Sequence, residues 1–230
     1  MSLFSTIETE CPACEATSKY ELVFSVNADR RPELRAEIMA RTFQRLTCPE
    51  CGGLFRLEPE FTYFHAAGKQ FLTVRPASEL PGWPEQEARA VATFNRFWGP
   101  GADPVAAQIG SELGHRVVFG WEAAHEKLVA IDAGVDDVTL EHAKLALLRT
   151  QDDISIGNAA MRLVGVDQAD NLVLGLFQGA DEHVLEQFLV PRALLSEIEA
   201  GADDWAPLRK QLSEGAFVDI QRVLMVPADA

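Results

Sequence analysis

Features that would identify a membrane protein or a secreted protein are missing from this chain of 230 residues. No apolar run approaches the roughly 20 residues that a helix needs to cross a bilayer. The segment that begins at Met1 has neither the basic stretch nor the apolar stretch of a signal peptide. We therefore expect a cytoplasmic protein without a membrane partner.

Motifs of several common enzyme classes are missing as well. The sequence contains no phosphate-binding Gly-X-X-X-X-Gly-Lys, no dinucleotide-binding Gly-X-Gly-X-X-Gly and no Gly-X-Ser-X-Gly nucleophile elbow. None of the five histidines lies in the His-Glu-X-X-His pattern of zinc proteases, of which Glu141-His142 is only a fragment. These absences predict a protein that is not an enzyme.

Cysteine is scarce, and its four copies form two Cys-Pro-X-Cys pairs, Cys11 with Cys14 and Cys48 with Cys51. Zn²⁺ favours a tetrahedral set of thiolates, and a two-residue spacer lets both cysteines of a pair reach one ion from a tight turn. Two such turns complete a closed shell, which stabilises a fold and leaves no coordination position for a substrate. The sequence therefore predicts a structural zinc site.

A redox dithiol is the main alternative, because thioredoxin-like proteins also use Cys-X-X-Cys in reducing compartments. Redox pairs lie at the start of a helix, whereas strand-like sequence follows both pairs here, at residues 20–26 and 54–57. Gly52 and Gly53 permit a turn with positive φ in which backbone N–H groups face the thiolates, and Glu15 stands in the matching place of the first pair. The pattern favours zinc over a thiol-based redox protein or enzyme.

The formal net charge of −15 is concentrated in the C-terminal part of the chain. Residues 1–80 contain 9 Lys and Arg against 11 Asp and Glu, whereas residues 81–230 contain 11 against 24. An acidic body repels nucleic acid, so we do not expect a nucleic-acid partner. The 33 residues between the cysteine pairs nevertheless carry a basic set, Arg30, Arg31, Arg35, Arg41 and Arg45. This set either binds an anionic partner, which we expect to be a protein, or forms a solvated helix face.

Hydrophobic periodicity predicts an α+β fold. An N-terminal zinc-ribbon-like antiparallel sheet with an inserted helix precedes further helices and a small C-terminal α+β unit. Strands are expected at residues 20–26, 54–57, 61–65, 70–74, 117–119, 161–166, 171–178, 184–190 and 216–224, and helices at residues 33–41, 85–98, 121–130, 137–149, 191–199 and 204–212. The expected parts are residues 1–80, 81–150 and 151–230.

Several stretches resemble the CpXC domain, a bacterial family named after its paired cysteines. Besides the two Cys-Pro-X-Cys motifs, these are Val26-Asn27-Ala28-Asp29, Pro32-Glu33-Leu34, Tyr63-Phe64-His65 and Ala133-Gly134-Val135-Asp136-Asp137. The resemblance covers roughly residues 6–150 and implies a metal-binding domain. The family has no established activity, so the resemblance implies no substrate. Ala66 stands where the family often has an aspartate after the histidine.

Two single residues are further candidates for a functional role. His65 ends a strand after the second cysteine pair, where we expect it either near the metal ligands or at the edge of the sheet. Trp83 lies in a loop with prolines and Gly82. Tryptophan is common both in cores and at interaction hot spots, so Trp83 is either an exposed anchor for a partner or a buried side chain.

An acidic cluster, Asp132, Asp136 and Asp137, precedes a predicted helix. It either binds a hard cation or, as the helix favours, contains an N-cap. His142 in the first turn of that helix is expected on the surface. Taken together, these patterns predict a zinc-stabilised module that binds a protein partner or acts as an adaptor.

Overall fold

The computed structural model describes residues 2–58, 60–150, 159–178, 184–201 and 205–225. The chain forms two compact units, of which unit 1 consists of Met1–Leu80 and Ala88–Trp121 and unit 2 of Pro81–Glu87 and Glu122–Ala230. The expected part 81–150 thus contributes residues to both units. No helix within the described ranges is long and apolar enough to span a membrane.

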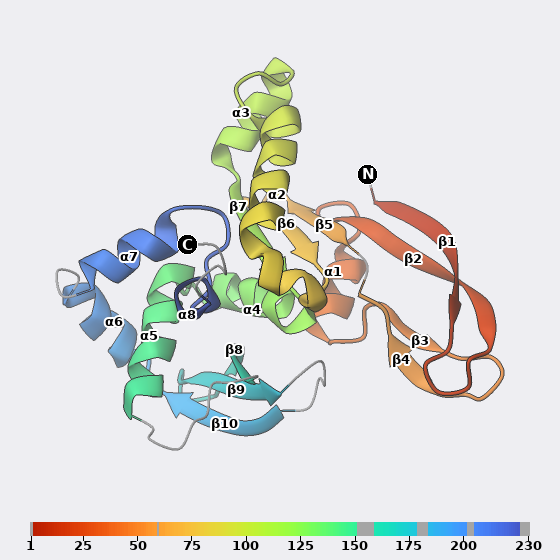
Figure 1. Ribbon diagram of the computed structural model, residues 1–230. Helices are drawn as coiled ribbons and strands as arrows, with labels where there is room; N and C mark the ends of the chain where they lie inside the picture. Colours follow the sequence, from red (N-terminus) through yellow and green to blue (C-terminus); the bar gives the residue numbers. More distant parts are fainter. Residues whose placement is uncertain (1, 59, 151–158, 179–183, 202–204, 226–230) are drawn as a thin grey trace. The chain divides into compact units, whose positions relative to one another are not determined.

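Unit 1 contains a five-stranded sheet with the strand order β1-β2-β5-β6-β7 and a separate two-stranded sheet of β3 and β4 (Figure 1). The strands are β1 (Leu3–Glu10), β2 (Thr17–Asn27), β3 (Arg45–Thr47), β4 (Leu54–Arg56), β5 (Phe61–His65), β6 (Gln70–Arg75) and β7 (Gly114–Phe119). The helices along this part of the chain are α1 (Pro32–Met39), the 3₁₀ helix η1 (Ala77–Gly82), α2 (Trp83–Trp98) and α3 (Pro104–Glu112). The α+β class is confirmed. The strands next to the first cysteine pair, β1 and β2, belong to the five-stranded sheet, whereas those next to the second pair, β3 and β4, form their own sheet. Strand β2 also pairs with β5 in parallel, so the single antiparallel sheet that we expected does not form.

Aromatic side chains cover both faces of the five-stranded sheet. Phe61 of β5 contacts Phe43 and Trp121, with ring centroids 5.5 and 5.2 Å apart. Successive side chains of a strand alternate between faces, so Phe64 points the other way. There it stacks on Trp98 of α2 at 5.2 Å. The core of unit 1 therefore lies around β5 and β6.

Unit 2 contains a three-stranded antiparallel sheet with the order β10-β9-β8. Its elements are α4 (Trp121–Asp132), α5 (Asp137–Thr150), β8 (Ala159–Val166), β9 (Leu172–Gln178), β10 (Val184–Val190), α6 (Ala193–Ala200), α7 (Ala206–Ser213) and α8 (Gln221–Leu224). The predicted elements of this part are confirmed with small shifts at their ends, with the exception of the strand at residues 216–224.

Residues 216–220 are buried without forming a strand. Their backbone groups bind charged side chains: the Phe217 N–H donates to Glu87 Oε1 at 2.8 Å, Lys127 Nζ donates to the Val218 carbonyl at 2.7 Å, and the Ile220 N–H donates to Glu141 Oε2 at 3.0 Å. These side chains take the place of a neighbouring strand. The predicted strand is therefore wrong.

Five charged side chains form a buried cluster in unit 2: Glu126, Glu141, Lys144, Arg162 and Asp219. Lys144 Nζ donates to Glu126 Oε1 at 2.7 Å and to Glu141 Oε1 at 2.9 Å. Arg162 donates to Glu126 Oε1 at 3.3 Å and to Asp219 Oδ2 at 2.5 Å. Three carboxyl groups thus share two cations, and burial raises the pKa of Glu141 to about 7.

Candidate metal centre

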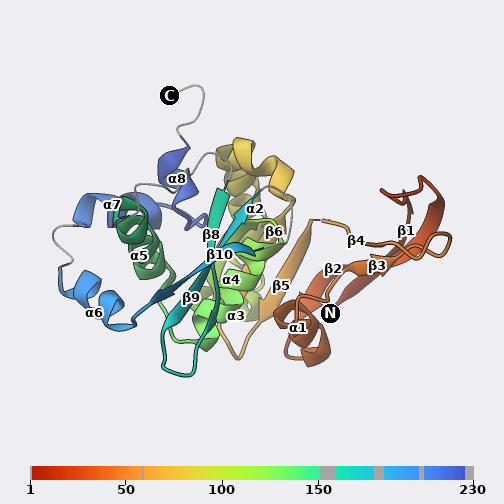
Figure 2. The ribbon, with the colours of Figure 1, turned by 90° about the horizontal axis from the view of Figure 1, so that it is seen from below.

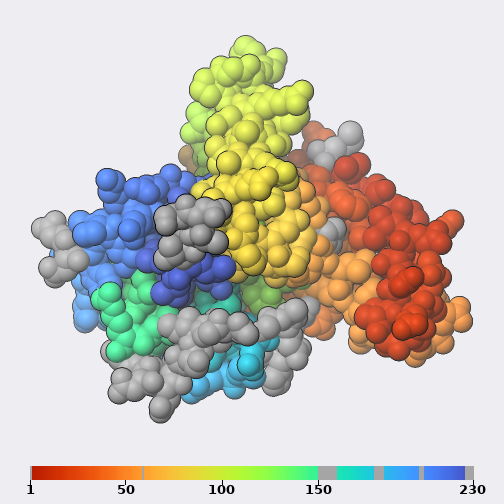
Figure 3. Space-filling view, in the orientation of Figure 1, coloured from red at the N-terminus to blue at the C-terminus, as the bar shows by residue number. Residues whose placement is uncertain are grey.

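Each cysteine pair lies in the turn of a β-hairpin. Cys11 and Cys14 lie between β1 and β2, and Cys48 and Cys51 lie between β3 and β4. The two hairpins lie side by side in both ribbon views (Figures 1 and 2). Their red and orange atoms touch in the space-filling view (Figure 3). The fold thus brings together two pairs that α1 separates in the sequence.

The two cysteine turns have the same backbone hydrogen bonds. The N–H of the first cysteine donates to the carbonyl five residues later, at 3.0 Å for Cys11 and 2.9 Å for Cys48. The N–H of Glu15 or Gly52 returns to the carbonyl of that first cysteine, in both turns at 2.9 Å. These two residues have positive φ, 60° at Glu15 and 71° at Gly52. Glu15 therefore holds a left-handed conformation that glycine adopts more readily.

The four thiols form one compact cluster, with all Sγ atoms within 4.8 Å of one another. The contacts between the pairs are 3.8 Å for Cys11 and Cys51 and 3.7 Å for Cys14 and Cys48. A tetrahedron with metal–sulfur bonds of about 2.3 Å has edges of about 3.8 Å. Cys11 and Cys48 are buried, whereas Cys14 and Cys51 are exposed. The cluster therefore fits a tetrahedral metal ion.

The thiols differ in how readily they ionise. The backbone N–H of Cys51 lowers the pKa of Cys48 to about 7, against the effect of burial. At Cys14 the backbone N–H of Ala16 lowers the pKa, but hydrogen bonds among the thiols together with burial outweigh it and raise the pKa to about 12. Four thiolates at this spacing repel one another and need a cation between them, which is the charge that a bound metal ion supplies.

Apolar packing around the cysteines is sparse among the described residues. Strand β1 has no buried residue, and the first buried side chain of β2 is Leu22. Tyr20 of β2 meets the ring of Phe55 of β4 edge-on at 5.5 Å. The Gly53 N–H donates to Cys51 Sγ at 3.4 Å, as the glycine pair predicts. A region with so little core is one in which a metal ion contributes much of the local stability.

His65 lies far from the cysteines, so the hypothesis that it supports the metal ligands is wrong. Strand β2 starts close after Cys14 and has 11 residues, which span roughly 30 Å. Strand β5 pairs with the far end of β2, where its Phe64 lies opposite Asn27. His65 Nε2 instead lies 3.8 Å from Asp29 Oδ1.

Asp29 places a carboxylate beside His65, although position 66, where the family often has an aspartate, is an alanine. Its carboxylate accepts hydrogen bonds from the backbone N–H of Ala66 at 2.6 Å and of Ala67 at 3.1 Å. Burial raises the pKa of Asp29, but these two bonds and His65 outweigh burial and lower it. The pair closes the turn between β5 and β6, which is a structural role.

The basic set lies on and around α1. Arg30 and Arg45 are exposed, and Arg35 and Arg41 are half-buried. The Arg31 side chain pairs with Glu33 and lies over the Phe4 ring at 5.0 Å. Arg30 and Arg31 are thus the adjacent members of the set with guanidinium groups that a partner can reach.

Trp83 is buried, so the hypothesis of an exposed anchor is wrong. Its ring lies 5.5 Å from that of Phe217, and the Arg222 guanidinium lies 4.6 Å above it. Glu87, one turn later in α2, binds the same Arg222 at 2.9 Å. Trp83 belongs to the packing of unit 2.

The acidic cluster before α5 contains the N-cap of this helix and an ion pair. Asp136 Oδ2 accepts hydrogen bonds from the N–H and the hydroxyl of Thr139, both at 2.9 Å, which confirms the N-cap. Asp137 pairs with Lys127 at 3.0 Å. Within the described residues, the four cysteines are the group of three or more metal-ligating side chains that lie close enough to share an ion.

His142 is fully buried, so the expectation of a surface position is wrong. Its Nδ1 donates to the carbonyl of Val138 at 2.7 Å. Burial lowers the pKa of His142, which keeps the ring neutral. The buried cluster around Glu141 was also missed, because charged residues with helical spacing are usually exposed. The nearby apolar stripe of α5 was the available signal that this helix is buried.

A comparison with known protein families matches residues 9–144 to the family described as CpXC protein. No curated protein and no solved structure matches the chain. The matched region contains all four cysteines and the basic set. It ends within α5, so β8 to β10 and α6 to α8 lie outside it.

Proposed function

The chain belongs to the CpXC family, and we propose that it is a zinc-ribbon-like module in which Cys11, Cys14, Cys48 and Cys51 hold a structural Zn²⁺. The observation that carries this proposal is the cluster of four Sγ atoms within 4.8 Å. Soft thiolates in a tetrahedron favour zinc among the common divalent ions. A closed shell of four protein ligands leaves no position for a substrate, which supports a role without catalysis.

In this proposal the zinc-bound hairpins form a rigid base for α1, and the module binds a protein. Arg30 and Arg31 offer two adjacent cations on a chain of net charge −15. An acidic surface on the partner would complement them, because guanidinium groups form strong hydrogen bonds with carboxylates.

Metal analysis of the purified full chain tests the first part. We expect about one zinc per chain by mass spectrometry, and loss of zinc in Cys14→Ser and Cys51→Ser but not in the control Ser18→Ala. Alkylation of the thiols should require a chelator. A folded, metal-free chain whose hairpin amides exchange at the same rate with and without a chelator would contradict the proposal. A thiol that labels at once would support the redox alternative.

Affinity purification tests the second part. The zinc-loaded chain is used as bait beside the double variant Arg30→Glu/Arg31→Glu and the control Arg96→Glu, which changes another exposed arginine of unit 1. We expect a protein with an acidic surface to be retained by the wild type and the control and lost with the double variant. Equal retention by all three baits would refute binding through this face.

A further inference from the structure

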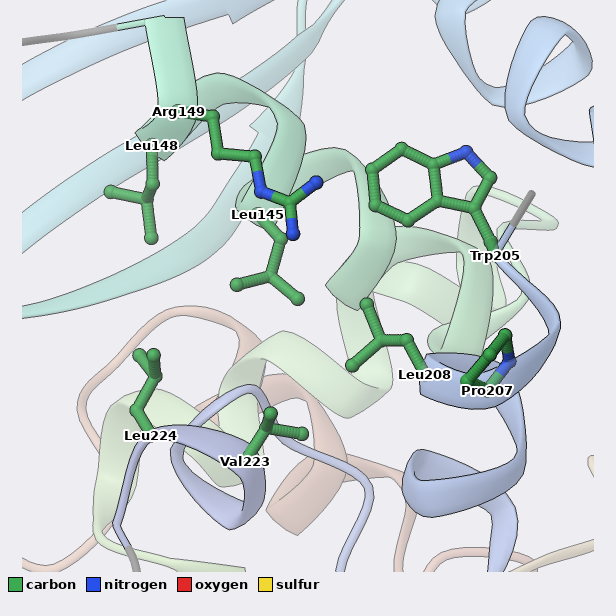
Figure 4. A pocket seen from close by; sticks show the side chains of 8 residues that line it. All are labelled: Leu145, Leu148, Arg149, Trp205, Pro207, Leu208, Val223 and Leu224. Atoms are coloured by element: carbon green, nitrogen blue, oxygen red, sulfur yellow. The ribbon is translucent and has the colours of Figure 1, made fainter.

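Unit 2 contains a cavity of about 390 Å³ between α5, α7 and α8 (Figure 4). Leu145 and Leu148 of α5 line it, together with Leu208 of α7 and Val223 of α8. Ligand sites in proteins have volumes of about 300–1,000 Å³, so this cavity suits a small ligand. Its aliphatic walls favour an apolar group.

Arg149 is the charged residue of the lining. It is exposed, and its guanidinium lies 5.4 Å from the centre of the Trp205 ring. Figure 4 shows the guanidinium pointing from α5 toward the indole, across the opening between the apolar side chains. Within the described residues the structure gives this guanidinium no acidic partner at ion-pair distance. It is the cationic group that this lining offers to an anion.

The Trp205 ring is fixed from a second side by the buried ring of His142. The two centroids are 5.4 Å apart and the planes are at 77°, an edge-to-face contact that stabilises the ring position. His142 is itself held by its hydrogen bond to the Val138 carbonyl. The Trp205 ring beneath the Arg149 guanidinium is thus held in place before a ligand binds, which reduces the entropy lost on binding.

We propose that this cavity binds a small amphipathic carboxylate, with its alkyl chain between the leucines and its carboxylate on the guanidinium of Arg149. The carboxylate matches the donors of guanidinium in a two-point hydrogen bond. A single negative charge fits best, because the C-terminal part of the chain is strongly acidic and repels multiply charged ligands. The apolar walls supply the remaining affinity through burial of the alkyl chain.

Titration of the ¹⁵N-labelled full chain with decanoate below its micelle concentration tests this site. We expect saturable binding, with amide shifts concentrated in α5, α7 and α8. Decanol has the same chain without the charge and should bind at least tenfold more weakly, as should decyltrimethylammonium with its opposite charge. Hexanoate and tetradecanoate then test how much chain the cavity holds.

Three variants separate the two contacts. Arg149→Gln should weaken decanoate binding about tenfold, because the amide can keep one of the two hydrogen bonds but loses the other together with the positive charge. Leu208→Trp should abolish binding by filling the cavity. Arg96→Gln is the matched control, because Arg96 also lies over an aromatic ring, that of Phe97 at 5.4 Å, on an exposed helix surface in unit 1. It should bind decanoate like the wild type.

Three outcomes would overturn the proposal. The first is the absence of saturable binding, and the second is equal binding of decanol and decanoate, which would remove the role of the cation. The third is equal loss in Arg149→Gln and Arg96→Gln. Unchanged circular dichroism of the variants ensures that each result reports on the site and not on unfolding.

Discussion

Glu15 in the first cysteine turn and Gly52 in the second occupy equivalent positions, with φ of 60° and 71° and the same hydrogen bond to the first cysteine of their turn. A side chain with a Cβ is disfavoured in this left-handed region by roughly 1–2 kcal/mol. The first turn therefore carries a strain that the second avoids. This difference is measurable if the cysteines bind the proposed metal ion, because strain in either turn would then lower the affinity for that ion.

Glu15→Gly should relieve that strain. We expect the apparent zinc affinity of the full chain to rise about fivefold, which corresponds to about 1 kcal/mol. Gly52→Ala should lower the affinity by a similar factor, since a Cβ there meets no atom within 4 Å and only the conformation is unfavourable. Competition with a chromophoric chelator measures both. Glu15→Gln removes the charge but keeps the Cβ, so an affinity gain in this control would assign the effect to charge.

Gly110 of α3 allows this helix to approach α2 closely. A Cβ at this position would lie 1.9 Å from the carbonyl oxygen of Trp98 in α2, which is backbone and cannot rotate away. Gly110→Ala should therefore destabilise the α2–α3 packing by about 3 kcal/mol. Faster amide exchange in α3 would report this loss. Gly101→Ala, where a Cβ meets no atom within 4 Å, is the control and should leave exchange in α3 unchanged.

The elements with a strong local signal were predictable. The strands at residues 61–65 and 70–74 have alternating apolar residues and a four-residue turn, and the structure confirms them as β5 and β6. Helix α3 was not predicted, although Asp103 followed by Pro104 is a standard start signal and Asp103 accepts a hydrogen bond from the Val105 N–H. Strand β1 was not predicted because it buries no side chain and shows no apolar period.

Deprotonation of Glu141 should make unit 2 less stable as the pH rises. Its pKa is about 7 in the folded chain against an ordinary value of 4.5. The contribution of this group is therefore complete below pH 4.5 and is lost as the pH rises through about 7. At about 1.36 kcal/mol for each pH unit, we expect a decrease on the order of 3 kcal/mol.

Glu141→Gln should flatten this dependence. Lys144 and the Ile220 N–H bind different oxygens of the carboxylate, so the single amide oxygen can replace one of these acceptors, and the amide gains no charge as the pH rises. Urea unfolding at several pH values, followed by amide exchange in α5, measures the slope of the unfolding free energy against pH. An equal slope in wild type and variant would show that another group titrates.

Arg162 neutralises two carboxylates in the same cluster. Arg162→Met should destabilise unit 2 by about 3–5 kcal/mol, because Asp219 and Glu126 would remain buried with one cation fewer. The double variant Arg162→Met/Asp219→Asn should regain part of this loss. The side-chain amide oxygen at position 219 of the double variant can still accept from the Gln221 N–H, as Asp219 Oδ1 does at 2.9 Å in the wild type. Denaturant titration measures the free energy of unfolding of the three proteins. A double variant less stable than the single variant would contradict the prediction.

The cysteine cluster of the candidate site could be predicted from the sequence, whereas the positions of the other candidate residues could not. Cysteine in pairs has few uses, so the cluster of four cysteines could be predicted from spacing alone. The placement of His65, Trp83 and His142 depends on strand register and on contacts with residues far away in the sequence. His65 lies at the far end of β2 because β5 pairs with β2 in parallel, and no local pattern distinguishes that arrangement from an antiparallel one.

The buried segment 216–220 also sets the order of events during protein synthesis. Ile220 lies 79 positions after Glu141, and Val218 lies 91 positions after Lys127. While the ribosome is still translating the intervening residues, these two side chains cannot reach their backbone partners. The hairpins that carry the cysteines have by then left the exit tunnel. Unit 1 can therefore bring its four cysteines together on the nascent chain, whereas α4 and α5 must wait for the last part of unit 2 before they are packed.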